Sequence, residues 1–236
     1  MQNFKQKKLK AFTLTELAIV LVIIGLIIGG VTTGSSLIKQ SQVRSVIYDI
    51  TNFKNSINAF KLQYGQLPGD FNNATALFGG GTANGNGDEH ILYSGGPNAN
   101  ESLRMWQHLD LAGILPGNYT GVGGGTGNEA DIGTNTPPSK LNNGGYYIDY
   151  GTFNGYSTSA NILYFGAFTA NSQCNSSVIS ANYAYNIDLK MDDGQPMNGV
   201  VHGFHPTLGT PNCRSSNTAY NISDQTTKCQ MSFMIN

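Results

Sequence analysis

The feature that most constrains this chain is a long uncharged apolar stretch with a single acid near its start. Residues 12 to 38 contain Glu16 and no other charged residue. A helix of about 20 apolar residues crosses the hydrocarbon core of a bilayer, so this stretch is long enough to do so. A carboxylate near hydrocarbon is costly unless a cation pairs with it, which indicates that Glu16 has a function. A cut between Ala11 and Phe12 would supply that cation, because it would expose the Phe12 amine.

The residues before the apolar stretch favour an orientation. They include four lysines and no acid, namely Lys5, Lys7, Lys8 and Lys10. Positive charge tends to stay on the cytoplasmic side, so the leader is predicted to be cytoplasmic and the rest of the chain to face outward. A secretory signal peptide has an apolar core of roughly 7 to 15 residues and a small-residue cleavage site after it, which does not fit. A plain membrane anchor is the alternative, and it would have no use for Glu16.

A short motif, Ala11-Phe12-Thr13-Leu14-Thr15-Glu16, lies between the lysine-bearing leader and the apolar run. It resembles the processing motif of type IV prepilins and type II secretion pseudopilins. The resemblance implies that a membrane peptidase cuts before Phe12 and methylates the new amine. It also implies that Glu16 guides assembly into a helical filament by pairing with the Phe12 amine of a neighbouring subunit. The family usually has glycine before the cut, and Ala11 is also small, so cleavage is expected.

A helical stripe of apolar residues continues beyond the membrane-length stretch. It recurs at steps of three and four and comprises Val43, Val46, Ile50, Phe53, Ile57, Phe60 and Tyr64. Gly65 and Pro68 then indicate a helix end. We therefore predict an α+β fold with one helix from about Phe12 to Tyr64, transmembrane in its first half and amphipathic in its second. The predicted organisation is a leader at 1–11, this helix at 12–64 and a globular head at 65–236.

The head is rich in glycine and asparagine and contains several predicted elements. Short helices are expected over 71–78 and over 101–112, the second capped by Asn100, with Trp106 on its apolar face. Segments 146–150, 162–169 and 230–235 are predicted strands of a small antiparallel sheet, joined by long loops. Residues 180–194 fit a strand or a helix. A helix is favoured, because the segment resembles one in a group of large pilin-like proteins.

Three cysteines, Cys174, Cys213 and Cys229, lie in the part predicted to face outward, where disulfides persist. Pilins often carry a short C-terminal disulfide loop, so the resemblance favours Cys213 with Cys229 and leaves Cys174 free or in an alternative pairing. A zinc site is the rival, but no Cys-x-x-Cys or histidine-rich spacing supports it. His202 and His205 are accordingly predicted to be surface residues.

One loop has the pattern of a cation site. Asn84, Asn86 and Asp88 place oxygen-bearing side chains at alternate positions, as at the start of a calcium loop, and Glu101 could complete it. Related pseudopilins often fix a head loop with calcium, which the resemblance extends to this chain. The expected glycine after the third ligand is Glu89 here, and a polar turn is the alternative.

The sequence contains no catalytic signature. There is no Gly-x-Ser-x-Gly, no His-Glu-x-x-His and no phosphate loop ending in Gly-Lys-Ser/Thr, and glycine runs at 79–81 and 123–127 are interpreted as flexible loops. A second acidic cluster, Asp188, Asp192 and Asp193, is interpreted as a helix end and turn. The net charge is −1, without a basic patch on the head, so nucleic-acid binding is not expected as a main role.

These observations predict a non-enzymatic structural subunit of a type IV pilus or a type II secretion pseudopilus. Its expected partners are other copies of itself, other pilins, the prepilin peptidase and the inner-membrane assembly platform. It is expected to cross the cytoplasmic membrane once, with the head outside, before joining a filament in the periplasm or at the cell surface. The alternative is a membrane-tethered extracytoplasmic binding module for a sugar or polymer. The sequence is compatible with a pilus subunit and with a pseudopilus subunit, and with a major and a minor subunit.

Overall fold

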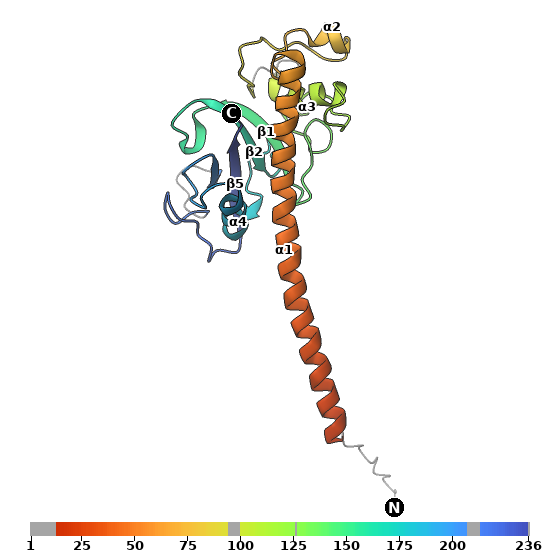
Figure 1. Cartoon of the computed structure of the whole chain (residues 1–236), viewed down its shortest axis with the longest axis vertical. Coiled ribbons are helices and arrows are strands. Elements are labelled where there is room, and N and C mark those ends of the chain that lie inside the picture. The colour runs from red at the N-terminus through yellow and green to blue at the C-terminus, as the bar shows by residue number, and fades with distance from the viewer. Residues whose placement is uncertain (1–12, 94–99, 126, 207–212, 236) are drawn as a thin grey trace, which may run out of the picture. The chain divides into compact units, whose positions relative to one another are not determined.

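The computed structural model describes residues 13–93, 100–125, 127–206 and 213–235. It divides into two compact units, one up to Ser41 and one from Gln42 onward. Helix α1 (Leu14–Tyr64) contributes to both units. The fold class is α+β, as predicted, with a long N-terminal helix, a small antiparallel sheet and short helices (Figure 1).

The first unit is the apolar part of α1. Every leucine, isoleucine and valine side chain between Leu14 and Ile38 is at least 45% exposed. Among the described residues, α1 is the one helix that is long and apolar enough to cross a membrane. An apolar surface of this kind requires a lipid or protein partner, because water does not solvate it favourably.

The second half of α1 belongs to the second unit and helps to form its core. The predicted stripe from Val43 to Phe60 is at most 5% exposed, and Tyr64 packs against the same cluster with partial exposure. Phe53 makes edge contacts with Trp106 and Tyr146, each with ring centroids 4.9 Å apart. The amphipathic pattern therefore correctly indicated which face of the helix is buried.

A five-stranded antiparallel sheet packs against this face of the helix (Figure 1). Its strands are β1 (Gly145–Gly151), β2 (Ala160–Gly166), β3 (Ile179–Ser180), β4 (Val201–Phe204) and β5 (Thr227–Met234). β2 lies between β1 and β5, and both β3 and β4 pair with β5. Leu163 of β2 faces Ile148 of β1 and Phe233 of β5 in register. The predicted strands are present, and β3 and β4 are additional.

The remaining elements are three α-helices and one short 3₁₀ turn. They are α2 (Ala74–Phe78), α3 (Glu101–Leu111), α4 (Ala181–Met191) and η1 (Phe153–Gly155). Asn100 caps α3 as predicted, because its side-chain oxygen accepts from the Leu103 N–H at 3.3 Å. The segment with ambiguous periodicity is a helix, α4. α2 begins three residues later than expected, since the carbonyls of Asp70 and Phe71 accept from Gly87 and Gly85 instead of starting a helix.

The prediction that His202 lies on the surface is wrong. His202 is on β4 and is 2% exposed. Its ring stacks on Tyr156 with centroids 3.9 Å apart, and its Nδ1 lies 2.9 Å from the Asn154 carbonyl oxygen. The sequence around it is rich in glycine and reads as a loop, whereas pairing with β5 turns it into a buried strand.

Candidate functional site

The first candidate site is the N-terminal end of α1, where Thr13 and Glu16 form a reciprocal cap. The Thr13 N–H and hydroxyl both donate to Glu16 Oε2 at 2.8 Å, and the Glu16 N–H donates to Thr13 Oγ1 at 3.2 Å. This geometry is a capping box, which satisfies N–H groups that have no partner within the helix. Thr13 is a residue that our sequence reasoning missed, although the Thr-x-x-Glu spacing is the known sequence signal for such a cap.

The capping box corrects one sequence argument. A plain membrane anchor would have a use for Glu16, because helix capping stabilises any helix that begins here. The presence of an acid at this position therefore does not by itself separate a filament subunit from an anchor. What separates them is a requirement for the negative charge of Glu16 beyond its hydrogen bonds. Ala11 and Phe12, the predicted cleavage and methylation residues, lie outside the described residues.

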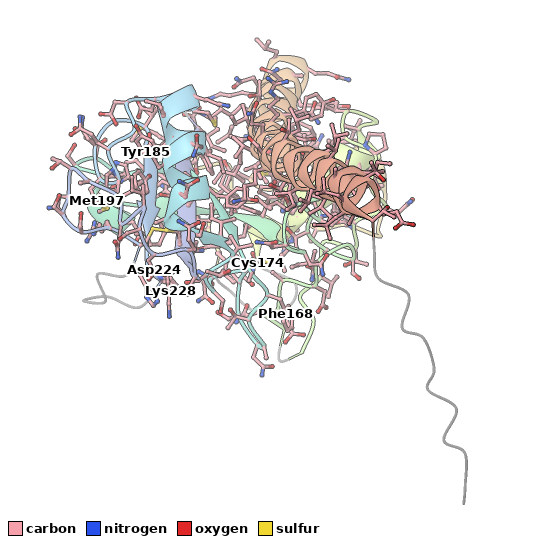
Figure 2. The ribbon with its side chains drawn as sticks, turned by 90° about the horizontal axis from the view of Figure 1, so that it is seen from below. Phe168, Cys174, Tyr185, Met197, Asp224 and Lys228 are labelled. Atoms are coloured by element: carbon pink, nitrogen blue, oxygen red, sulfur yellow. A yellow bond between two sulfur atoms is a disulfide. The ribbon has the colours of Figure 1, made fainter. Side chains whose placement is uncertain are left out.

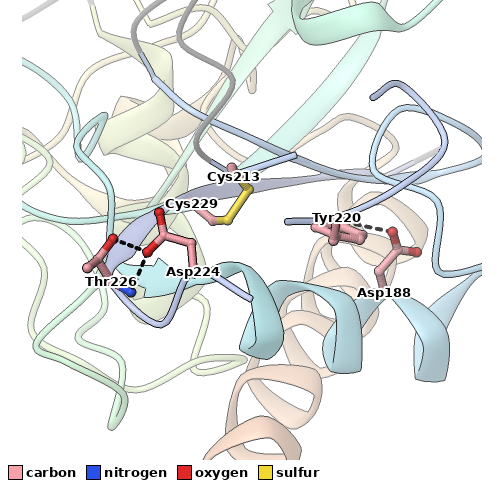
Figure 3. The surroundings of a disulfide bond; sticks show 6 residues. All are labelled: Asp188, Cys213, Tyr220, Asp224, Thr226 and Cys229. Atoms are coloured by element: carbon pink, nitrogen blue, oxygen red, sulfur yellow. Dashed lines mark hydrogen bonds between the residues drawn. A yellow bond between two sulfur atoms is a disulfide. The ribbon is translucent and has the colours of Figure 1, made fainter. Parts of the chain in front are cut away.

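A disulfide joins Cys213 and Cys229 across a separation of 16 residues, with their Cα atoms 5.0 Å apart (Figure 3). Both residues are fully buried. Within the closed loop, the Tyr220 hydroxyl donates to Asp188 Oδ2 on α4 at 2.7 Å. Cys229 is itself on β5, where it pairs with Ile179 of β3. The disulfide loop is therefore tied to the sheet at one end and to α4 near its middle.

Cys174 is buried and free (Figure 2). Its Sγ lies 3.9 Å from the Ala130 carbonyl oxygen. Burial raises the pKa of this thiol to about 12. Because the thiolate is the reactive form, Cys174 is a packing residue and has little nucleophilic character at neutral pH.

The loop predicted to bind calcium is arranged around a carboxylate. Asp70 is 1% exposed and accepts the N–H groups of Gly87, Asp88 and Glu89 at 2.6, 3.1 and 2.7 Å. Backbone N–H groups that converge in this way hold an anion, not a cation. Burial raises the pKa of Asp70, and the three N–H donors oppose that rise.

The four predicted ligands of this loop are only partly brought together. Asn86 and Asp88 share a hydrogen bond of 2.9 Å, and the Glu101 carboxylate accepts from the Asn86 N–H at 3.3 Å. Asn84 Oδ1 instead accepts two hydrogen bonds from Thr75, on α2. Burial raises the pKa of Glu101. These hydrogen bonds are those expected of a polar turn, the alternative to the calcium site.

The second acidic cluster lies at the end of α4, as predicted. Carboxylate oxygens of Asp188, Asp192 and Asp193 lie within 4.8 Å of one another, and this is the one such group of metal-ligand side chains among the described residues. Asp192 is the C-terminal cap residue of α4 and accepts from the backbone N–H groups of Val200 and Val201. Burial raises the pKa of Asp188 to about 7, partly opposed by its bonds from Tyr220 and Gly194. These contacts fix the turn after the helix.

Comparison with protein families places a known motif on the first part of the chain. Residues 6–32 match the prokaryotic N-terminal methylation motif, which is the signature of type IV pilins and pseudopilins. The motif marks structural pilins and does not define a class of enzyme. Comparison with curated proteins and with solved structures found no match. The chain therefore carries a type IV pilin-like N-terminus of the kind that prepilin peptidase processes.

Proposed function

We propose that this chain is a non-enzymatic structural subunit of a type IV pilus or a type II secretion pseudopilus. The observation that carries the proposal is the methylation motif at residues 6–32, in which Glu16 is the one acid and residues 12–32 have no other charge. The exposed apolar surface of the first part of α1 supports it, since a filament of bundled helices would cover that surface.

In this proposal, prepilin peptidase cuts between Ala11 and Phe12 in the cytoplasmic membrane and the new amine is methylated. Burial of apolar side chains along α1 holds the subunits together, but it is non-directional and permits many axial positions. The pairing of Glu16 with the Phe12 amine of a neighbouring subunit selects one of these axial positions. The assembly platform and other pilins act as partners, and the head faces the periplasm or the cell exterior.

Processing is tested by the intact mass of the protein isolated from its native envelope. The expected mass corresponds to the loss of residues 1–11 and the addition of one methyl group. A mature membrane pool that retains the leader would contradict the proposal.

The role of the Glu16 charge is tested by a pair of matched variants. Glu16→Gln keeps an oxygen that accepts the Thr13 N–H but removes the charge, whereas Thr13→Val removes the capping hydroxyl and keeps the charge. If register depends on the charge pair, Glu16→Gln is membrane-inserted and processed but yields few filaments, and Thr13→Val assembles. Filaments of normal yield and length from Glu16→Gln would refute the register role. They would favour the membrane-tethered binding module, which needs the cap alone.

A further inference from the structure

A cavity of about 350 Å³ lies in the second unit, between the glycine-rich loop after α2, the loop around Gly121 and one side of α3. It is lined by Gly80, Gly81, Thr82, Ala83, Arg104, Gln107, Gly121 and Val122. Its volume is within the usual range of small-molecule sites, roughly 300–1,000 Å³. None of these lining residues belongs to the disulfide loop or to the capping box of Thr13 and Glu16.

Arg104 is the charged residue of this cavity, and it is 4% exposed. Its Nη1 donates to the Asn84 carbonyl oxygen at 2.8 Å, which is the one hydrogen bond that its side chain makes to the described residues. No carboxylate of the described residues lies within 4.0 Å of it, since the ion pairs there are Lys61 with Glu89 and His90 with Asp88. A guanidinium has five N–H donors and keeps its charge, so four donors are left for another acceptor.

The acid that acts electrostatically on Arg104, Glu101, forms no ion pair with it. The charge of Glu101 favours the protonated guanidinium, but its two oxygens accept from the backbone N–H groups of Asn86 and Leu92. The other guanidinium nitrogens of Arg104 are not among the buried side-chain atoms that lack a partner, so they keep access to solvent. An anion in the cavity would replace that solvent and pair with the charge.

The walls of the cavity offer further donors. The backbone N–H groups of Gly80, Gly81 and Ala83 make no hydrogen bond to other described residues. Gly80 and Gly81 are exposed, and a Cβ added at either would meet no atom within 4 Å, so there is open space beside the backbone of this stretch. The Thr82 N–H between them is bonded to the Gly79 carbonyl, and unpaired N–H groups of a glycine-rich turn are a common means of holding an anion.

Gln107 hydrogen-bonds to both loops that line the cavity and fixes the distance between them. Its Nε2 donates to the Gly81 carbonyl at 3.1 Å and to the Thr120 carbonyl at 2.7 Å, and its Oε1 accepts from the Thr82 hydroxyl at 2.7 Å. Gly121 has φ +68°, and a Cβ there would lie 2.4 Å from Gln107 Oε1. The cavity is thus preorganised by side chains that are already satisfied, and Arg104 is left for the ligand.

We propose that this cavity binds a phosphate group, either as free inorganic phosphate or as part of a small phosphate monoester. A guanidinium fork together with several N–H groups matches the many acceptor sites of a tetrahedral oxyanion better than the two oxygens of a carboxylate. The remaining volume accommodates the organic part of a monoester. This property of the head does not depend on the filament function.

The test is calorimetric titration of the full-length protein in detergent micelles at constant ionic strength. Inorganic phosphate and glycerol 3-phosphate are the two ligand arms, with acetate and chloride as control anions. We expect saturable binding in at least one phosphate arm, none with acetate or chloride, and loss of binding in Arg104→Gln. Stronger binding of glycerol 3-phosphate assigns the site to a monoester, and equal or stronger binding of inorganic phosphate assigns it to the free ion. Absence of phosphate binding, or equal binding by Arg104→Gln, overturns the proposal.

A second pair of variants keeps the test decisive if Arg104→Gln does not fold. Val122 lines the cavity and is 46% exposed, whereas Ile222 is 49% exposed and does not line it. Val122→Glu and Ile222→Glu add the same charge at exposed apolar positions. A carboxylate several ångströms from the bound anion should weaken binding about five- to tenfold in Val122→Glu, because like charges repel. Ile222→Glu should bind as the wild type does. Equal affinity in the two variants contradicts the assigned site.

Discussion

Removal of the Cys213–Cys229 disulfide should lower the stability of the second unit by an amount that follows from its loop. The bond joins residues separated by 16 positions. In the chain-entropy model, a closed loop of this length restricts the unfolded chain by about 3 kcal/mol at 25 °C. Both cysteines are fully buried, so alanine is the suitable replacement, because it adds no hydroxyl that would need a partner. We therefore expect loss of the crosslink in Cys213→Ala/Cys229→Ala to cost about 3 kcal/mol of unfolding free energy, in addition to the cost of removing two buried sulfur atoms.

The assay is urea unfolding of the full-length protein in detergent micelles, followed by tryptophan fluorescence. Trp106 is the only tryptophan in the chain and is fully buried in the second unit, so its emission reports on that unit. Cys174→Ala is the matched control. It removes a buried thiol but no crosslink, and it should cost about 1 kcal/mol, a typical value for a single substitution. Reductant should destabilise the wild type and Cys174→Ala by about 3 kcal/mol and leave the double variant unchanged.

Two results would refute this reasoning. One is a double variant within about 1 kcal/mol of the wild type, which would show that restriction of the unfolded chain by this bond does not supply the expected stability. The other is a linked peptide that contains Cys174 in a non-reducing peptide map, which would mean that the bond is formed by a different pair.

Two further predictions concern pH and calcium. His108 Nδ1 accepts the Gly69 N–H at 2.9 Å, and burial lowers the pKa of this residue to about 4. Since the folded pKa is below the unfolded one, its stabilisation is present above about pH 6.5 and is lost as the pH falls through 4. The free-energy difference between wild type and His108→Asn should shrink by about 3 kcal/mol from pH 7 to pH 4, and a constant difference would refute this. Calcium and chelator melts should coincide, because Asp70 already holds its loop; a higher melting temperature in calcium would instead indicate the cation site.

Features with a local cause were predictable. The buried stripe of α1 follows from spacing at three and four residues, and the cap of α3 follows from Asn100 placed directly before the helix. The capping box of Thr13 and Glu16 is equally local, and the Thr-x-x-Glu spacing is sufficient to predict it. The preferred cysteine pair came from a family resemblance, because spacing alone does not define connectivity among three cysteines.

The sequence by itself therefore determined the membrane-length helix, its amphipathic continuation, and the motif at residues 6–32 that connects the chain to pilins. Only the tertiary structure decided which polar groups meet. Asp70 accepts N–H groups 17 to 19 residues away, and Tyr220 meets Asp188 across 32 residues. The cavity at Arg104 likewise combines two glycine-rich loops that read as featureless in the sequence. The physical reason is that hydrophobic periodicity repeats along a single element, whereas the partner of a buried polar group is selected by packing between segments distant in sequence.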